Sequence, residues 1–268
     1  MFVLAFSRLI RAIIHLKSKC NFKRSPVLAL ACIGNLLAYV CVADVAVELS
    51  VLDPNDGVME SGSKLMALPL GLHPLESSID SSSGVLVGVH GYSSRGYEWV
   101  YPLQTIDDDE TTTMFFRWDF SDCPHTSATV LIESLKELLE KQEGVDKITI
   151  VGHSLGGVLV TTMVSQWKFK LRADLHVVAA PLGGDNARLN ECGAILPKKI
   201  PSTIRLFQWR TQHKLDGAYK DLRVDPQVVS LDGSLAITLP ETYRERRLGH
   251  NWSVSYVADR IANTREEN

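Results

Sequence analysis

KITIVGHSLGG, residues 147–157, is the stretch that decides the fold of this chain. Four β-branched residues, 148–151, predict a buried strand, and a helical pattern follows Gly156. Between the two lies G-x-S-x-G, in which Gly152 and Gly156 flank Ser154. A serine on so tight a turn needs a strained backbone and neighbours without a β-carbon, so that its hydroxyl stands clear of the sheet. The pattern therefore predicts a nucleophile at Ser154; a serine-capped turn without chemistry is the alternative.

Strands and helices alternate along most of the remaining sequence. The runs expected to form strands are 45–52, 84–91, 113–120, 147–151, 175–180, 203–209 and 235–239. Helices are expected over 126–143, 156–167 and 253–262. The Ser-, Gly-, Pro- and Asp-rich residues 53–83 are expected to be loop with at most one strand. Such alternation favours a mostly parallel central sheet with helices on both faces, whose ligands bind beyond the carboxyl ends of the strands.

Two backbone N–H groups are expected to form an oxyanion hole. An acyl-transfer enzyme aims such donors at the charge that develops on the carbonyl oxygen. One donor is expected at Leu155, directly after the nucleophile, and the other at Tyr92, in the loop after strand 84–91. Gly91 allows that loop to fold closely. A simple turn at the end of the strand is the alternative interpretation.

The base that activates a serine is usually a histidine, which follows the nucleophile and the acid in this type of fold. His176, His213 and His250 are the histidines after Ser154. His176 lies inside an expected strand and is interpreted as structural, and His213 comes too early to follow the acid. His250 lies between the last strand and the last helix and is the expected base.

The acid that orients the base is expected at Asp216. This aspartate lies on the loop just past strand 203–209, where the acid of such a triad belongs. Asp221 and Asp225 lie on the same loop. Asp185 remains the other possibility, because it follows strand 175–180 and the acid can lie one strand earlier.

These motifs resemble the α/β-hydrolase superfamily, and GHSLGG (152–157) resembles its lipase and esterase branches in particular. The resemblance covers most of 84–262 and rests also on HGY at 90–92 and LGH at 248–250. It implies an α/β-hydrolase fold and hydrolysis of a carboxylic ester, from a small molecule or a lipid, without a cofactor. The stretch 181–202 is short, so no large lid domain is expected.

The expected mechanism is acyl transfer through an acyl-enzyme intermediate. Ser154 attacks the acyl carbonyl while His250 accepts its proton and Asp216 orients the imidazole. The N–H groups of Leu155 and Tyr92 hold the oxyanion. Three rivals remain: an acyltransferase, an amidase or peptidase with the same triad, and an inactive membrane-tethered binding protein. The intact set of Ser, Asp and His argues against the last.

Residues 1–46 differ in composition from residues 47–268, the expected hydrolase domain. Basic residues are scattered through 8–24, and the apolar run 26–43 follows them. Such a pattern is typical of a signal peptide or an N-terminal membrane anchor. The catalytic domain is therefore expected outside the cytoplasm, exported or anchored. A buried helix of the globular domain is the alternative.

Composition and cysteine spacing limit the remaining possibilities. With 268 residues, 45% of them apolar, and a formal charge of −3, the chain suits one sizeable core and gives no sign of nucleic-acid binding. No CxxC or HExxH motif predicts a metal site. Beyond residue 46 the cysteines are Cys123 and Cys192. Both follow strands whose carboxyl ends share one edge of the sheet, so an oxidising compartment predicts a disulfide between them; two free thiols are the alternative.

Overall fold

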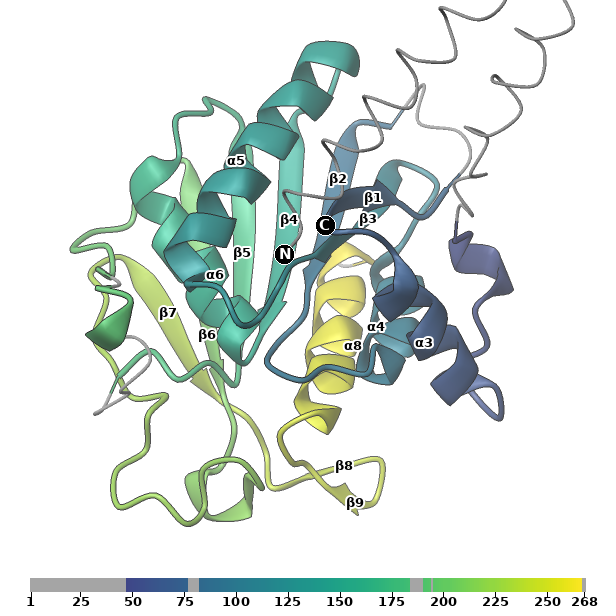
Figure 1. The fold of residues 1–268 in the computed structure, drawn as a ribbon. Helices are drawn as coiled ribbons and strands as arrows, with labels where there is room; N and C mark the ends of the chain where they lie inside the picture. The colour runs from purple at the N-terminus through teal and green to yellow at the C-terminus, as the bar shows by residue number, and fades with distance from the viewer. Residues whose placement is uncertain (1–46, 77–81, 184–189, 194, 267–268) are drawn as a thin grey trace, which may run out of the picture. The chain divides into compact units, whose positions relative to one another are not determined.

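A seven-stranded sheet forms the centre of the computed structural model (Figure 1). The structure describes residues 47–76, 82–183, 190–193 and 195–266, all within a unit that runs from Ala46 to Asn268. The strands are β1 (Gly71–Pro74), β2 (Gly84–Val89), β3 (Thr111–Arg117), β4 (Lys147–His153), β5 (Arg172–Val178), β6 (Ile204–Arg210) and β7 (Ser234–Thr238). Their order in the sheet is β1-β3-β2-β4-β5-β6-β7, and all neighbours are parallel except β1 and β3.

Helices cover both faces of this sheet. They are α3 (Val58–Ala67), α4 (Tyr97–Ile106), α5 (Pro124–Lys141), α6 (Leu155–Met163) and α8 (Trp252–Glu266). Short 3-10 turns form η1 (Leu49–Val51), η2 (Val164–Gln166) and η3 (His213–Leu215), and a small hairpin forms β8 (Thr242–Tyr243) and β9 (Arg246–Arg247). Helices α5 and α6 pack on one face, and α3, α4 and α8 pack on the other (Figure 1). The predicted fold class, a mostly parallel sheet between helices, is confirmed.

The two faces of β2 show how the sequence builds two cores. Val85 and Val87 are buried in the core beneath α5 and α6, whereas Leu86 joins the core with α3, α4 and α8. This alternation follows from the two-residue period of side chains along a strand. Gly88 lies against α4, where a β-carbon would come within 3.0 Å of the Trp99 side chain. The glycine therefore lets a fully buried tryptophan pack directly on the strand.

The region before β2 differs most from the sequence expectations. A strand was expected over 45–52, but the described part of that stretch contains only η1, so this prediction is wrong. Residues 53–83 were expected to be loop with at most one strand. They contain one strand, β1, but also helix α3, which was not expected. A β-carbon on Gly62 of α3 would lie 2.2 Å from the backbone nitrogen of Tyr97. Close packing on the start of α4 thus stabilises a Ser- and Gly-containing helix that local propensity disfavours.

The prediction that no large lid covers the site is also confirmed for the described residues. The parts of the β5–β6 connection that the structure describes build no separate domain.

Among the residues placed in the structure, no helix has the length and apolar character needed to cross a bilayer. The segment interpreted as a signal peptide or anchor, 1–46, lies outside the described residues.

A disulfide joins Cys123, at the start of α5, to Cys192 in the β5–β6 connection. The two Cα atoms are 5.5 Å apart, and 69 positions separate the cysteines in the sequence. The predicted pairing is therefore confirmed. It ties together two connections that both leave the carboxyl end of the sheet.

Candidate active site

Ser154 lies on a sharp turn between β4 and α6. Its φ of 53° and ψ of −121° are strained for a residue with a side chain, and its N–H donates to the carbonyl of Val178 at 2.8 Å. The two flanking glycines make the turn possible. A β-carbon on Gly152 would lie 2.7 Å from the carbonyl oxygen of Gly156, and one on Gly156 would lie 2.3 Å from that of Val89. The geometry expected from G-x-S-x-G is present.

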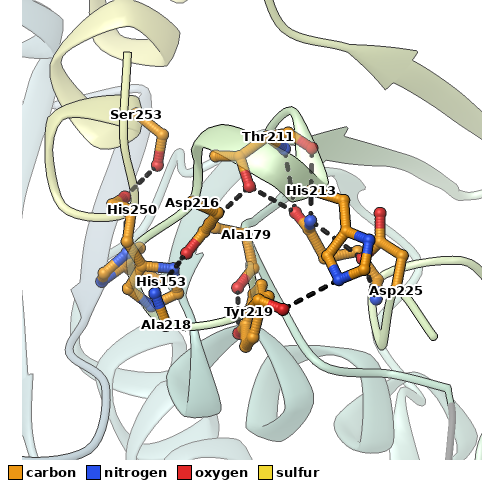
Figure 2. Close-up of polar contacts among 11 residues, drawn as sticks. His153, Ala179, Thr211, His213, Asp216, Ala218, Tyr219, Asp225, His250 and Ser253 are labelled. Atoms are coloured by element: carbon orange, nitrogen blue, oxygen red, sulfur yellow. Dashed lines mark hydrogen bonds and ion pairs between the residues drawn. The ribbon is translucent and has the colours of Figure 1, made fainter. Parts of the chain in front are cut away.

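Asp216 and His250 meet at the same edge of the sheet. Asp216 follows β6 and η3, and His250 immediately precedes α8. The His250 Nδ1 atom lies 3.0 Å from Oδ2 of Asp216, whose side chain is completely buried (Figure 2). An ionised carboxylate only accepts hydrogen bonds, so Nδ1 of His250 carries the proton. The other ring nitrogen, Nε2, is left as the acceptor that a general base requires.

Hydrogen bonds keep the Asp216 carboxylate ionised. Burial alone favours the neutral acid, but bonds from His250, from the Thr211 hydroxyl at 2.5 Å and from the Ala218 N–H at 2.8 Å hold the pKa of Asp216 below its usual value. Figure 2 shows His250, from the loop before α8, and Thr211, from the β6–β7 connection, contacting the carboxylate; Ala218 belongs to the same connection as Thr211. The imidazole of His250 therefore faces a fixed negative charge.

His153, which the sequence analysis did not single out, holds the backbone of His250. Its Nε2–H donates to the carbonyl oxygen of His250 at 3.1 Å, and the Ser253 hydroxyl donates to the same oxygen at 2.5 Å. The two imidazole rings lie 4.7 Å apart. Burial, and then the neighbouring His250, lower the pKa of His153 to about 3, so this ring is neutral at physiological pH. The one feature of the sequence that could have indicated a role for His153 is its position directly before Ser154.

Tyr219 is a second residue that the sequence analysis missed. Its hydroxyl donates to the carbonyl of Ala179 at 2.7 Å, and its ring packs edge-on against His250 at 5.0 Å. Ser154 lies close enough to this hydroxyl to lower the pKa of the phenol, against the larger effect of burial. Burial raises the pKa of Tyr219, so the phenol remains neutral. No local motif marks this tyrosine, because the folding of the β6–β7 connection brings it to the serine.

The loop after β2 packs against the nucleophile. A β-carbon on Gly91 would lie 2.9 Å from the Cβ of Ser154 and 3.6 Å from the backbone nitrogen of Leu155. The peptide that follows Gly91 is therefore next to the turn, as a Tyr92 donor requires. The Tyr92 side chain points outward: 62% of it is exposed, and its ring packs on Phe120 at 4.9 Å.

Ser154 and His250 both line one cavity of about 190 Å³. Tyr92, Arg95 and Asn251 form other parts of its wall. The cavity opens at the carboxyl end of β2 and β4, where the topology of a parallel sheet places ligands. The structure thus brings the candidate nucleophile, the candidate base and the loop of a candidate oxyanion donor to one space.

The other candidates lie elsewhere. Asp225 accepts hydrogen bonds from the following glutamine at 3.0 and 3.1 Å, and Asp221 is exposed to solvent. Asp185 lies outside the described residues. His176 lies within β5 and accepts a bond from a tryptophan indole at 3.1 Å, and His213 contacts the carbonyl oxygen of a tyrosine at 2.8 Å. Across the described residues, no group of three His, Cys, Asp or Glu side chains is arranged to hold a metal ion.

Sequence comparison finds two matches. The family described as lipase (class 3) matches residues 89–207. Abhydrolase domain-containing protein abhd-5.2 of Caenorhabditis elegans is 26% identical over 145 residues, which cover 51% of this chain and 31% of that protein. The match therefore spans about a third of the length of this curated relative.

Structural comparison finds bacterial proteins with low sequence identity. Est1E from Butyrivibrio proteoclasticus is 12% identical, with a TM-score of 0.49 over 73% of this chain and 92% of that one. XC6422 from Xanthomonas campestris, described as a serine hydrolase without a lid, is 12% identical, with a TM-score of 0.48 over 73% and 87% of the two chains.

Proposed function

We propose that this chain, which has a mostly parallel central sheet and matches the lipase (class 3) family over residues 89–207, is a serine hydrolase of the α/β-hydrolase type that cleaves carboxylic esters. One observation carries the proposal. His250 is hydrogen-bonded to the buried Asp216 at 3.0 Å and lines the same cavity as Ser154, whose backbone is strained at φ 53°. A strained serine beside a histidine that a carboxylate orients is the arrangement for nucleophilic catalysis.

In the proposed mechanism, the Ser154 hydroxyl attacks the acyl carbonyl while Nε2 of His250 takes its proton. Asp216 holds the imidazole in the required tautomer and stabilises the imidazolium. The N–H groups of Leu155 and Tyr92 stabilise the oxyanion. His250 then protonates the departing alcohol, and a water molecule that it activates hydrolyses the acyl-enzyme.

The proposed substrate is a small-molecule or lipid ester. The cavity of about 190 Å³ is smaller than the roughly 300–1,000 Å³ of most ligand pockets. The ester group and its nearest atoms fit such a space, and the rest of a longer substrate would extend over the rim. A panel of p-nitrophenyl esters of increasing acyl length measures this limit directly.

Reaction with a fluorophosphonate probe, together with that ester panel, tests the proposal. The wild type should be labelled at Ser154 and should turn over at least one ester. Ser154→Ala should lose labelling and at least about 10³-fold in kcat. Ser134→Ala, at a half-buried position of α5, is the matched control and should behave as the wild type. A Ser154→Ala protein with activity within tenfold of the wild type refutes the assignment.

Product analysis separates the hydrolase from the related enzymes. Free acid from an ester in water supports hydrolysis, whereas transfer to an added alcohol or amine in preference to water identifies an acyltransferase. Turnover of amides faster than of the matching esters identifies an amidase or peptidase. A protein that neither reacts with the probe nor turns over any ester is a binding protein on this fold.

We also propose that the catalytic domain lies outside the cytoplasm, exported or anchored through residues 1–46. The disulfide between Cys123 and Cys192 supports this location, because such bonds persist in oxidising compartments. A fusion of residues 1–46 to a reporter that is active only outside the cytoplasm should give signal. A fusion that stays soluble and cytoplasmic refutes the proposal.

A further inference from the structure

His90, at the end of β2, is completely buried beside the proposed oxyanion loop. Its Nε2 atom lies 3.1 Å from a guanidinium nitrogen of Arg117 and 3.3 Å from the backbone nitrogen of Trp118. Its Nδ1 atom lies 3.0 Å from the carbonyl oxygen of Gly91. The Trp118 indole donates to the carbonyl of His90 itself at 2.8 Å. Both ring nitrogens therefore have fixed partners.

These partners decide which ring nitrogen carries the proton. A guanidinium and a backbone N–H only donate hydrogen bonds, so Nε2 of His90 is the acceptor. A carbonyl oxygen only accepts, so Nδ1–H donates to Gly91. Burial, together with the nearby charge of Arg117, lowers the pKa of His90 to about 4. The ring is thus a neutral imidazole with its proton on Nδ1 at the pH where the protein works.

The Gly91 carbonyl that receives this proton belongs to the same peptide unit as the N–H of Tyr92. A trans peptide is planar, and its C=O and N–H point in opposite directions; the described residues contain no cis peptide. A bond that fixes the carbonyl on one side therefore fixes the N–H on the other side. Because Gly91 packs on Ser154 and near the nitrogen of Leu155, this peptide lies beside the nucleophile.

We propose that His90 is the positioning residue of the oxyanion hole: its Nδ1–H holds the Gly91 carbonyl and thereby aims the Tyr92 N–H at the reacting carbonyl oxygen. This inference rests on the proposed esterase function. Arg117 supports the arrangement from behind, since it also donates to the carbonyl oxygens of Met66 and Trp118, at 3.1 and 3.0 Å. The imidazole is therefore held between Arg117 and the Gly91–Tyr92 peptide, whose N–H must point in one direction to serve the oxyanion hole.

Two substitutions separate the positioning role from a purely structural one. His90→Asn places an amide N–H close to the position of Nδ1–H and keeps the bond to Gly91, but loses the acceptor for Arg117. His90→Gln reaches the region of Nε2 and keeps that acceptor, but loses the donor to Gly91. A positioning role predicts that Gln lowers kcat by about 10- to 100-fold with KM unchanged, a part of the roughly 10²–10³-fold loss for a deleted oxyanion donor. Asn should lower kcat less than tenfold.

The rate of inactivation by a fluorophosphonate provides a second readout, because its tetrahedral adduct needs the same donors. It should follow kcat across the wild type, Asn and Gln proteins, while thermal unfolding reports any loss of fold. A wild type that does not react refutes the proposed function, and the inference with it. A reactive wild type whose Asn protein is slower than its Gln protein, or whose two variants both keep wild-type rates, refutes the inference alone.

A measurement on the wild type tests the premise without any substitution. Long-range proton–nitrogen NMR correlation of the histidine rings distinguishes the two neutral tautomers. His90 should show a protonated Nδ1 and an unprotonated Nε2. A proton on Nε2 overturns the proposal, because Nδ1 then has nothing to donate to Gly91.

Discussion

Asp216→Asn exchanges one oxygen of a buried carboxylate for an amide nitrogen and should stop catalysis by changing the tautomer of His250. In the wild type, Oδ1 accepts from the N–H of Ala218 at 2.8 Å, and Oδ2 accepts from His250 at 3.0 Å and from Thr211 at 2.5 Å. The asparagine oxygen can accept a hydrogen bond at only one of these two positions. When the oxygen accepts from Ala218, the NH₂ group of the amide lies toward Nδ1 of His250. The histidine must then accept at Nδ1 and carry its proton on Nε2, where it is no longer a base.

The hydrogen bonds give the size of the effect. The opposite orientation of the amide keeps the useful tautomer but faces NH₂ to the Ala218 N–H, which costs about 1–3 kcal/mol for an unsatisfied buried donor. That cost leaves between about a fifth and about 1/150 of the molecules competent. Loss of the negative charge 3.0 Å from the imidazolium removes the remaining stabilisation. Together these terms predict a decrease in kcat of about 10⁴-fold, or about 5.5 kcal/mol of transition-state stabilisation.

Steady-state kinetics on the best p-nitrophenyl ester measures this loss, with labelling by the fluorophosphonate as a second assay. Asp225→Asn is the matched control, since Asp225 lies on the same connection but accepts hydrogen bonds from Gln227 rather than from His250. Asp185→Asn tests the earlier-strand alternative. If Asp216→Asn keeps more than a tenth of the wild-type kcat, or if Asp185→Asn causes the larger loss, the acid has been assigned wrongly.

Three further perturbations have defined outcomes. The pKa of His153 is lowered to about 3, far below the unfolded value of about 6.5, so the unfolded state binds the extra proton and stability falls as the pH drops from about 6.5 toward 3. Urea unfolding at a series of pH values measures the free energy of unfolding against pH. Over this range its slope should be about 1.4 kcal/mol per pH unit shallower for His153→Gln than for the wild type, and an unchanged slope contradicts burial of a neutral ring. Replacing Cys123 and Cys192 by serine should lower the free energy of unfolding by about 4 kcal/mol, because the disulfide closes a loop of 69 positions. Equal stability of the variant and the oxidised wild type would argue against the bond. Tyr219→Phe removes the hydroxyl that donates to Ala179 near Ser154. If this hydroxyl also acts on the serine, kcat should fall about fivefold, the equivalent of one hydrogen bond of about 1 kcal/mol; a wild-type rate would show that it does not.

Some structural expectations failed because they depended on contacts between distant segments. Helix α3 has Ser61, Gly62 and Ser63 at its centre and lies within a stretch rich in Ser, Gly, Pro and Asp, so its helical pattern was missed. Only the approach of Gly62 to Tyr97 shows why a helix forms there. Helix α4 was missed for a similar reason, since Pro102 lies inside it and the burial of Trp99 against β2 outweighs local propensity.

The sequence alone determined the elements whose signals are local. Four β-branched residues followed by G-x-S-x-G predicted β4, the strained turn and α6, because glycines without side chains and a two-residue period act within a few positions. The order of Ser154, Asp216 and His250 along a strand–helix alternation predicted which edge of the sheet holds them. The tertiary structure alone decided what surrounds them. His153 bonds to His250, and Tyr219 bonds to Ala179, across connections far apart in the chain. His90 is held behind Gly91 by Arg117 and Trp118, at the end of another strand. Such bonds depend on the relative placement of whole strands, and no short stretch of sequence encodes that placement.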